Sequence, residues 1–307
     1  MAACSKNEEA PTHPATPSSF LDPGDYALAF ENGGRTRNYT LHVPPDARLG
    51  KALPLVFLFH GAAFNGKWFK EIIEIEDLSD RKGFVAVFPD GTGNTPWLLT
   101  WNAGNCCRYA KTNKVDDVGM TLALVEELKR IVRVDEKRIY AAGWSNGGML
   151  SYRLACEHAD VFAAVASVSG TLGVKNCEPS RRVPVLHFHG NRDEYVPFKG
   201  GKGEKTKAVE PQQSVDDCMG VWKKINGCTG DAKMEVLADK VKDETIVIRR
   251  RWKECADDSE VELYVIDGGG HNWPGAKTAA DEALGNLTMD ISANEIIWEF
   301  FSRHHLP

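Results

Sequence analysis

Ser145, Asp193 and His271 have the residue types and the order along the chain that nucleophilic acyl transfer requires. A serine hydroxyl is a poor nucleophile at its ordinary pKa, so a histidine must remove its proton and a carboxylate must orient that histidine. Three consecutive glycines precede His271 and leave its loop free to bring the imidazole over the serine. The sequence therefore predicts a triad with Ser145 as nucleophile, Asp193 as orienting acid and His271 as base.

Ser145 lies in a G-x-S-x-G segment, from Gly143 to Gly147, between an apolar run and a run that favours a helix. Such a segment forms a tight turn from a strand into a helix and holds the serine in a strained backbone conformation. Glycines are needed on both sides because a Cβ there would collide with the neighbouring strand and helix. The G-x-S-x-G pattern alone also occurs by chance in ordinary strand-to-helix turns. The assignment of Ser145 as the nucleophile therefore depends largely on Asp193 and His271.

Other acids and histidines compete for these roles. Glu194 follows Asp193 directly, but its longer side chain makes it the lesser candidate for the orienting acid. His60, His187 and His189 lie in or at the ends of apolar runs. A histidine in such a place is more often a partly buried residue that hydrogen-bonds loop backbone. We therefore interpret these three histidines as structural.

Acyl transfer also needs hydrogen-bond donors for the oxyanion that forms when the serine attacks a carbonyl. The backbone N–H of Asn146, at the start of the helix after Ser145, is the first predicted donor. The second is expected in the loop after the buried strand that ends at His60. The backbone N–H of Ala62 is our choice there, with Ala63 as the next candidate.

Alternating strands and helices must position these residues. Strands are expected at residues 25–31, 35–43, 53–60, 84–88, 139–143, 163–168, 183–188, 245–252 and 261–266, and helices at 68–81, 118–132, after Ser145, 215–225 and 293–304. This alternation predicts an α/β fold with a mostly parallel sheet of about eight strands and helices on both faces. The order serine, aspartate, histidine, with each residue in a loop after a strand, is that of the α/β-hydrolase fold. Ligands then bind beyond the carboxyl ends of the strands.

Several further residues are candidates for the substrate site or its support. Trp101 and Trp273 are expected close to the triad, either as flat walls for the substrate or as packing that holds the loops. Thr171 and Leu172 follow a strand and are expected to border the acyl group. Asp116 and Asp117 precede a helix, where an acid most simply caps the N-terminus. The alternative for this acidic pair is a place beneath the loop that carries Trp101.

A series of segments carries a family resemblance. They are Leu58-Phe59-His60-Gly61, Trp101-Asn102-Ala103-Gly104 with Cys106-Cys107, Val115 to Gly119, Gly143 to Met149, Leu154-Ala155-Cys156, His189 to Pro197, Asn226-Gly227-Cys228, Gly270 to Gly275 and Ile297 to Phe301. Together they resemble the motifs of the polyhydroxybutyrate depolymerase and feruloyl esterase family of secreted esterases. The resemblance covers nearly everything from about residue 25 to the end. It implies a serine esterase with the same triad. The chain departs from the family pattern at Ala62-Ala63-Phe64, where a glycine- or cysteine-bearing sequence is more usual.

Length and composition fit one catalytic domain, which we expect at residues 21–307. The chain has 307 residues, 42% of them hydrophobic, and no apolar run long enough to cross a bilayer. Residues 1–20 are rich in Pro, Thr, Ser, Glu and Ala, so we expect a disordered tether there. Met1-Ala2-Ala3-Cys4 resembles the end of a bacterial lipoprotein signal, in which the cysteine becomes lipidated. The alternative is an incidental cysteine near a free N-terminus.

Eight cysteines are many for a cytosolic enzyme, and no pair has zinc-ligand spacing with suitably placed histidines. Disulfides in an oxidising compartment are therefore predicted, with the protein secreted, periplasmic or lipid-anchored at the cell surface. Cys156 and Cys177 are expected at the same end of the sheet, where they can meet. Cys228 and Cys255 bracket a hairpin-like insertion and look like a pair of the family.

Cys106 and Cys107 are adjacent in the sequence and are expected on the active-site side. They either form a vicinal disulfide or one of them reaches another partner. Cys218 would then be unpaired.

The residues and the resemblance together predict a serine esterase that needs no metal or organic cofactor. Its expected substrates are feruloyl, other hydroxycinnamoyl or acetyl esters of plant polysaccharides, or similar small esters; the alternative is a polyhydroxybutyrate or other short-chain polyester. A net charge of −6 gives no electrostatic reason to bind nucleic acid. Three other hypotheses compete: a peptidase of the prolyl oligopeptidase type, an intracellular acyl hydrolase, and a cell-surface binding lipoprotein with a hydrolase fold. The last of these would be expected to have lost a triad residue.

Overall fold

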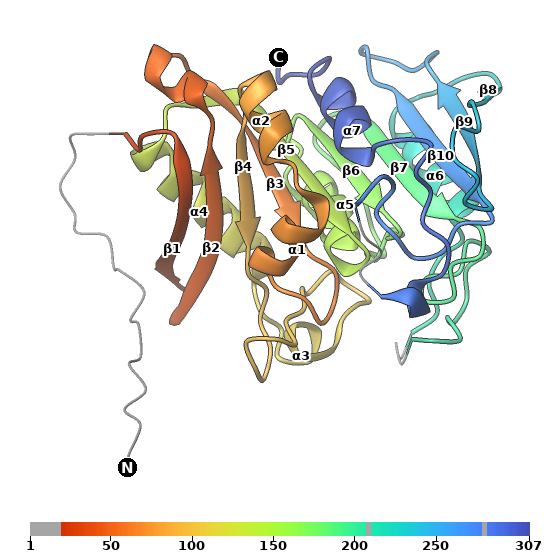
Figure 1. Ribbon diagram of the computed structural model, residues 1–307, viewed down its shortest axis with the longest axis horizontal. Helices are drawn as coiled ribbons and strands as arrows, with labels where there is room; N and C mark the ends of the chain where they lie inside the picture. Colours follow the sequence, from red (N-terminus) through yellow and green to blue (C-terminus); the bar gives the residue numbers. More distant parts are fainter. Residues whose placement is uncertain (1–19, 207–209, 278–280) are drawn as a thin grey trace.

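A single sheet runs through the centre of the computed structural model, which describes residues 20–206, 210–277 and 281–307 (Figure 1). The expected tether and Cys4 lie outside the described residues, except for Phe20. The strands are β1 (Gly24–Asn32), β2 (Arg35–Val43), β3 (Leu53–Phe59), β4 (Val85–Pro89), β5 (Val134–Trp144), β6 (Ala164–Val168), β7 (Val185–Gly190), β8 (Lys233–Val236), β9 (Ile246–Trp252) and β10 (Val261–Asp267). Their order across the sheet is β1-β2-β4-β3-β5-β6-β7-β10-β9-β8.

The middle of this sheet is parallel and its edges are antiparallel. Strands β4, β3, β5, β6, β7 and β10 pair in parallel, whereas β1 and β2 at one edge and β9 and β8 at the other pair antiparallel. The prediction of a mostly parallel α/β-hydrolase sheet is confirmed, but the described sheet has ten strands rather than about eight. Strand β8 was missed because all four of its residues are exposed, so no buried face produces an alternating pattern.

Helices cover both faces of the sheet. They are α1 (Gly66–Ile73), α2 (Glu76–Lys82), α3 (Arg108–Thr112), α4 (Asp117–Ile131), α5 (Asn146–Glu157), α6 (Val215–Ile225) and α7 (Ala293–Phe301), with short 3₁₀ helices η1 (Pro45–Leu49) and η2 (Glu282–Leu284). Helices α1, α2 and α7 pack with one hydrophobic core, and α4, α5 and α6 with the other, on the opposite face (Figure 1). Because both faces are covered, β3 is buried at every residue.

The helix expected over residues 68–81 is two helices in the structure. Helix α1 ends at Ile73, the φ of 45° at the next residue, Glu74, lies in the left-handed region, and α2 begins at Glu76. The break turns the chain so that Ile73, Ile75 and Leu78 are all buried in the same core. A single continuous helix was expected because the apolar residues on both sides of Glu74 keep a helical spacing.

The predicted disulfides are present in the structure. Bonds join Cys156 to Cys177 and Cys228 to Cys255, and Cys106 is bonded to its neighbour Cys107. This leaves Cys218 as a free, buried cysteine, as the sequence suggested. Separately, none of the described helices is both long enough and apolar enough to cross a membrane.

Candidate active site

Ser145 stands at the junction of β5 and α5, in a sharp and strained turn. Its φ of 55° and ψ of −118° lie outside the regions that most non-glycine residues adopt. The backbone N–H of Ser145 donates to the carbonyl of Val168 at 2.7 Å, which ties the turn to the end of β6. A Cβ on Gly147 would overlap the carbonyl oxygen atoms of Phe59 and His60. The glycine therefore allows the start of α5 to lie directly against the end of β3.

Asp193 and His271 come together from the loops that follow β7 and β10. The Nδ1–H of His271 donates to Oδ2 of Asp193 at 2.6 Å. The other carboxylate oxygen, Oδ1, accepts the backbone N–H groups of Tyr195 and Val196, both at 2.8 Å. Glu194 points elsewhere: its carboxylate is paired with Lys205 at 2.5 Å. The structure thus brings Asp193, and not Glu194, to the histidine.

The electrostatics of this pair keep Asp193 ionised. Burial by itself would raise the pKa of Asp193, but the charge of His271 in its protonated form and hydrogen bonds from His189 and His271 outweigh it and hold the pKa well below its usual range. Because an ionised carboxylate only accepts hydrogen bonds, Nδ1 of His271 carries a proton in either form of the ring. In the neutral imidazole, Nε2 of His271 then keeps its lone pair, as a general base requires.

Two aromatic rings flank the imidazole of His271. The ring of Tyr195 stacks on it with centroids 5.1 Å apart, and the ring of Trp144 lies 5.7 Å away. Neither aromatic residue was predicted to have a role at the site. Their positions in the sequence could have indicated this, because Trp144 directly precedes Ser145 and Tyr195 follows Asp193 by two residues. These contacts limit the rotation of the imidazole.

Ser145 and His271 both line a cavity of about 560 Å³. Much of its wall is apolar or aromatic, and this part includes Ala62, Phe64, Trp144, Met149, Tyr195 and Leu284. The bonded cysteines Cys106 and Cys107 also form part of the wall. A small organic group can therefore be held next to the serine hydroxyl and largely away from water.

Of the two candidates for the second oxyanion donor, Ala62 has the available N–H group. The N–H of Ala63 donates to the carbonyl of Leu99 at 2.9 Å, whereas within the described chain no acceptor is bonded to the N–H of Ala62. Asn146 begins α5, so its backbone N–H lacks an acceptor four residues earlier in the helix. The Asn146 side chain is engaged with Trp101: Oδ1 accepts the Trp101 N–H at 2.7 Å, and Nδ2 donates to the Trp101 carbonyl at 3.1 Å.

The predicted substrate walls need correction. Trp101, Thr171, Leu172 and Trp273 are all buried, and none of them is among the described residues that line the cavity. The indole N–H of Trp101 donates to the carbonyl of His60 at 2.9 Å, and that of Trp273 donates to Asn294 at 2.9 Å. Both tryptophans thus pack and hold loops, which is the alternative that the sequence analysis left open. A large apolar ring with one polar atom is well suited to this role.

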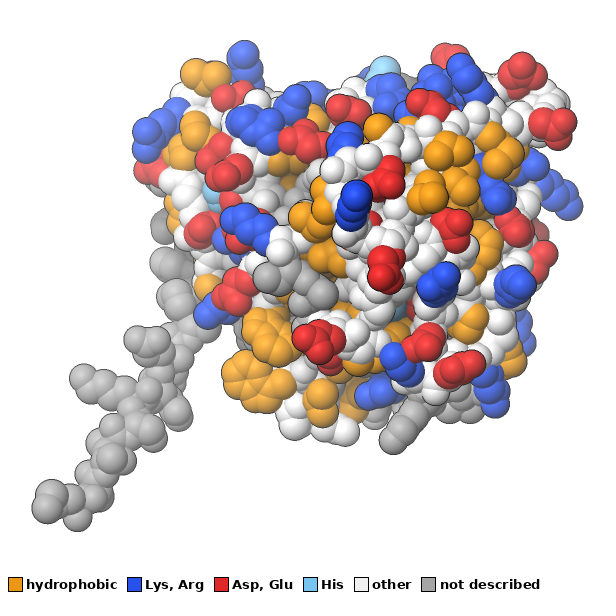
Figure 2. All heavy atoms as spheres, turned by 45° about the vertical axis from the view of Figure 1, so that its right-hand side comes forward, with side chains coloured by type: hydrophobic (Ala, Val, Ile, Leu, Met, Phe, Trp, Pro, Cys, Tyr) orange, Lys and Arg blue, Asp and Glu red, His pale blue; other side chains and the backbone are white. Residues whose placement is uncertain are grey.

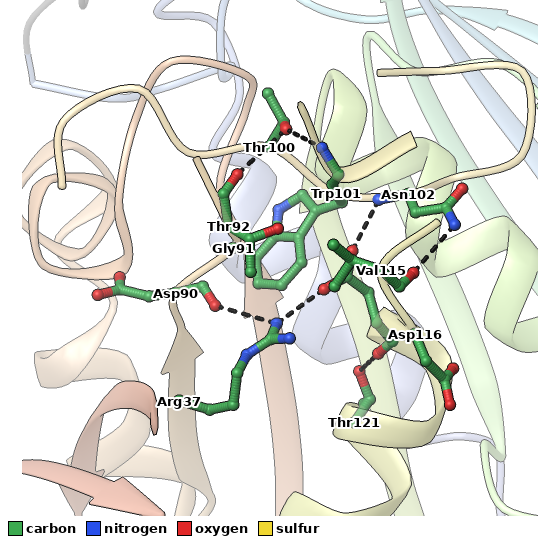
Figure 3. Close-up of polar contacts among 12 residues, drawn as sticks. Arg37, Asp90, Gly91, Thr92, Thr100, Trp101, Asn102, Val115, Asp116 and Thr121 are labelled. Carbon is green, nitrogen blue, oxygen red and sulfur yellow. Dashed lines mark hydrogen bonds and ion pairs between the residues drawn. The ribbon is translucent and has the colours of Figure 1, made fainter. Parts of the chain in front are cut away.

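Asp117 supports the loop that carries Trp101; Figure 3 shows this region, with Arg37, Trp101 and Asn102 labelled. Its Oδ1 accepts from Arg37 at 2.7 Å, and its Oδ2 accepts the backbone N–H of Asn102 at 2.7 Å. Both charged side chains are buried. Asp116 takes the capping role instead, because its Oδ1 accepts the N–H of Gly119 at 2.8 Å. The two adjacent acids therefore divide the two roles that the sequence analysis weighed for them.

Several known proteins with sequences similar to this chain are named as esterases. Residues 37–189 match the sequence profile of the family described as Esterase PHB depolymerase. The chain is 30% identical over 252 residues to the putative esterase NocK of Nocardia uniformis subsp. tsuyamanensis, covering 79% of this chain and 72% of that protein. It is also 30% identical over 231 residues to feruloyl esterase B of Piromyces equi. That match covers 72% of this chain but only 40% of the Piromyces protein, so the chain spans less than half of its length.

Solved structures share the fold at low sequence identity. The acetyl xylan esterase from Aspergillus awamori superposes with a TM-score of 0.54 and 14% identity, over 87% of this chain and 94% of that one. An S-formylglutathione hydrolase from Agrobacterium tumefaciens gives a TM-score of 0.51 and 14% identity, over 84% of this chain and 91% of that one. Taken with the sequence matches, these likenesses show that the chain is a member of the Esterase PHB depolymerase family with an α/β-hydrolase fold.

Proposed function

We propose that this protein is a serine carboxylic ester hydrolase that works through an acyl-enzyme. The observation that carries the proposal is the hydrogen bond of 2.6 Å between His271 and Asp193, with His271 and the strained Ser145 facing one cavity. Relatives named as a feruloyl esterase and a putative esterase support the same chemistry.

In the proposed reaction, Nε2 of His271 takes the proton of Ser145 as Oγ attacks the ester carbonyl. The backbone N–H groups of Ala62 and Asn146 hold the oxyanion. The intermediate collapses, and His271 gives the proton to the leaving alcohol. Water then attacks the acyl group with His271 again as the base, and the acid leaves. Asp193 stays ionised throughout and stabilises the imidazolium that forms.

The cavity supports a planar aromatic or short acyl group as the substrate. Phe64, Trp144 and Tyr195 line the same cavity as the serine, and Met149 adds an adaptable apolar contact. We therefore infer that feruloyl, other hydroxycinnamoyl or acetyl esters are the substrates, carried by plant polysaccharides or by small alcohols. Relatives named feruloyl esterase B and bifunctional acetylxylan esterase/xylanase are consistent with this inference.

Initial rates on four substrates test this choice: methyl ferulate, 4-nitrophenyl acetate, 4-nitrophenyl palmitate and polyhydroxybutyrate granules. We expect turnover of the first two and poor turnover of the palmitate, because a long flexible chain loses much of its conformational freedom when it is bound. A clear preference for the granules would instead favour polyester hydrolysis. That is the alternative to which the description of the matched family points.

Labelling with a fluorophosphonate tests the nucleophile separately. The reagent should add once, on the peptide that contains Ser145, and the Ser145→Ala variant should remain unlabelled and inactive. Ser302→Ala is the matched control because Ser302 is exposed at the end of α7, outside the cavity. Labelling at another serine, or full activity of Ser145→Ala, would refute the proposed nucleophile.

We also propose that the protein works outside the reducing cytoplasm, either secreted, in the periplasm or on the cell surface. Three disulfides support this location, because such bonds persist in oxidising compartments. More specifically, we propose that lipidation of Cys4 anchors the protein at the cell surface. Mass spectrometry of the N-terminal peptide from a membrane fraction tests it, and an unmodified Cys4 in that fraction would contradict it.

A further inference from the structure

A row of buried polar side chains runs away from the turn that carries Asp193. His189 and His187 lie on β7, Tyr152 lies on α5, and all three are fully buried. Nε2 of His189 is 2.7 Å from the carbonyl oxygen of Val196, and its Nδ1 is 2.9 Å from Nε2 of His187. Nδ1 of His187 in turn is 2.6 Å from the hydroxyl of Tyr152. In the mechanism proposed above none of these three side chains takes or gives a proton, although His189 helps to lower the pKa of Asp193.

With both imidazoles neutral, the Val196 end of the row sets the direction of each hydrogen bond in it. The Val196 carbonyl can only accept, so Nε2 of His189 carries the proton. In a neutral His189, Nδ1 is then an acceptor and receives the Nε2–H of His187. Burial lowers the pKa of His187 well below its usual range, so His187 is neutral as well. Its Nδ1 therefore accepts the O–H of Tyr152.

The row meets the catalytic acid at a turn that is held from two sides. Oδ1 of Asp193 accepts the backbone N–H groups of Tyr195 and Val196 from within the turn. The carbonyl of Val196 is held from below by His189, whose Nε2 also lies 3.4 Å from Oδ2 of Asp193. Oδ2 is the atom that accepts from His271. A shift of the turn would therefore move the carboxylate away from the imidazole.

We propose that His189, His187 and Tyr152 are positioning residues of the active site: each fixes the tautomer of the next, and together they hold the Asp193 turn in the orientation that catalysis needs. This inference rests on the proposed esterase function. Each of these buried polar side chains would destabilise the fold if it were left without a partner. A fully bonded row instead makes its surroundings rigid.

Two substitutions at His189 test the row. His189→Leu removes the donor to Val196, and we expect kcat on 4-nitrophenyl acetate to fall by about 10- to 100-fold with little change in KM, because misplacement of a catalytic group mainly slows the chemical step. His189→Gln keeps an N–H donor on a side chain of similar reach and should restore most of the rate. The low-field NMR signal of the His271 Nδ1 proton should weaken in His189→Leu and persist in His189→Gln. If His189 had only a structural role, kcat and the NMR signal would follow the stability of each variant. They would not depend on whether residue 189 carries an N–H donor.

Tyr152→Phe tests the far end of the row, and Tyr140→Phe is its matched control. Tyr140 is equally buried, but it packs in the core on the other face of the sheet, where its hydroxyl donates to the carbonyl of His304 at 2.7 Å. Both variants lose one buried hydroxyl. We expect kcat to fall several-fold in Tyr152→Phe, by a smaller factor than in His189→Leu because two imidazoles separate the change from Asp193. Tyr140→Phe should keep the kcat of the unchanged protein.

Three outcomes would overturn the proposal: an unchanged kcat in folded His189→Leu, no rescue by His189→Gln, or equal values of kcat in the two tyrosine variants. If His189→Leu does not fold, ¹⁵N NMR of the unchanged protein still decides, since the proposed row has both histidines neutral with the proton on Nε2. An imidazolium or an Nδ1–H tautomer at either position would contradict the row. Failure of the esterase proposal is distinguishable, because in that case the unchanged protein would not hydrolyse 4-nitrophenyl acetate or Ser145→Ala would keep the activity.

Discussion

At the scale of single residues, backbone N–H groups decide which of two neighbouring acids serves the histidine. Asp193 and Glu194 carry the same functional group, yet only the shorter side chain folds back onto the N–H groups of its own turn while its second oxygen reaches His271. Glu194 is exposed and pairs with Lys205. The assignment of the acid therefore follows from side-chain length and turn geometry.

Substitution of the two acids in parallel tests this assignment. We expect Asp193→Asn to lower kcat by about 10⁴-fold, because the amide cannot hold the imidazole in the required tautomer. Glu194→Gln, the matched control, should change kcat little, since its carboxylate faces Lys205 and solvent. Steady-state kinetics on 4-nitrophenyl acetate gives both values. A larger loss in Glu194→Gln would show that Glu194 is the acid.

The depressed pKa of Asp193 also predicts a dependence of stability on pH. A carboxyl whose pKa is lower in the folded state contributes stability above its unfolded pKa, which is about 3.9, and loses it as the pH falls toward the folded value. The difference in unfolding free energy between the unchanged protein and Asp193→Asn should therefore shrink from about pH 6 to about pH 3. Urea titrations at several pH values measure it. A difference that grows with acidity would contradict the sign.

At the scale of elements, the contact between β3 and the start of α5 depends on glycine. The carbonyl groups at the end of β3 occupy the space that a Cβ of Gly147 would need. This close approach places Ser145 at the edge of the sheet and Ala62, just after β3, beside the same cavity. A turn that is local in the sequence thus depends on a strand about 85 residues earlier in the chain.

Gly147→Ala should destabilise the protein by about 1–3 kcal/mol and lower activity, because the added methyl group meets backbone atoms that cannot rotate away. Gly220→Ala is the control within another helix: no atom lies within 4 Å of the added Cβ in α6. That change should be neutral or stabilising by up to about 1 kcal/mol, because alanine has the higher helix propensity. Thermal unfolding of both variants is the measurement. Equal stability of the two variants would refute the close approach.

At the scale of the whole molecule, the parallel sheet gathers functional groups from distant parts of the sequence. Ala62, Ser145, Asp193 and His271 follow β3, β5, β7 and β10, and the carboxyl ends of these parallel strands meet at one edge of the sheet. Acidic and basic side chains are interspersed on the face shown in Figure 2, and the chain has a net charge of −6. Selectivity is therefore expected from the shape and chemistry of the cavity rather than from a long-range field.

The disulfide between Cys228 and Cys255 belongs to this scale, because it joins the chain just after α6 to the chain just after β9. Removal of the bond in Cys228→Ser/Cys255→Ser should cost about 2–4 kcal/mol of unfolding free energy, mainly because the unfolded chain becomes less constrained. Denaturant unfolding under oxidising conditions measures the cost, and peptide mapping without reduction checks the bond. Free thiols at both positions in the unchanged protein would refute the prediction.

Local sequence patterns were sufficient to predict the family, the α/β-hydrolase fold and the candidates for the triad. The glycines around Ser145, the glycines before His271 and the alternation of strands and helices are short-range patterns, since they reflect backbone conformation and burial within one element. The antiparallel strand β8 was not predicted because it has no buried face and therefore no alternating apolar pattern.

Only the tertiary structure decided which way the side chains near the site face. Trp101 and Trp273 pack inward, whereas Tyr195 and Trp144 contact the imidazole, and no local pattern distinguishes an aromatic ring in the wall of a cavity from one in the core. The partners of these residues lie on other strands and loops. The choice between cavity and core therefore depends on contacts between segments far apart in the sequence, and those contacts exist only once the sheet has assembled.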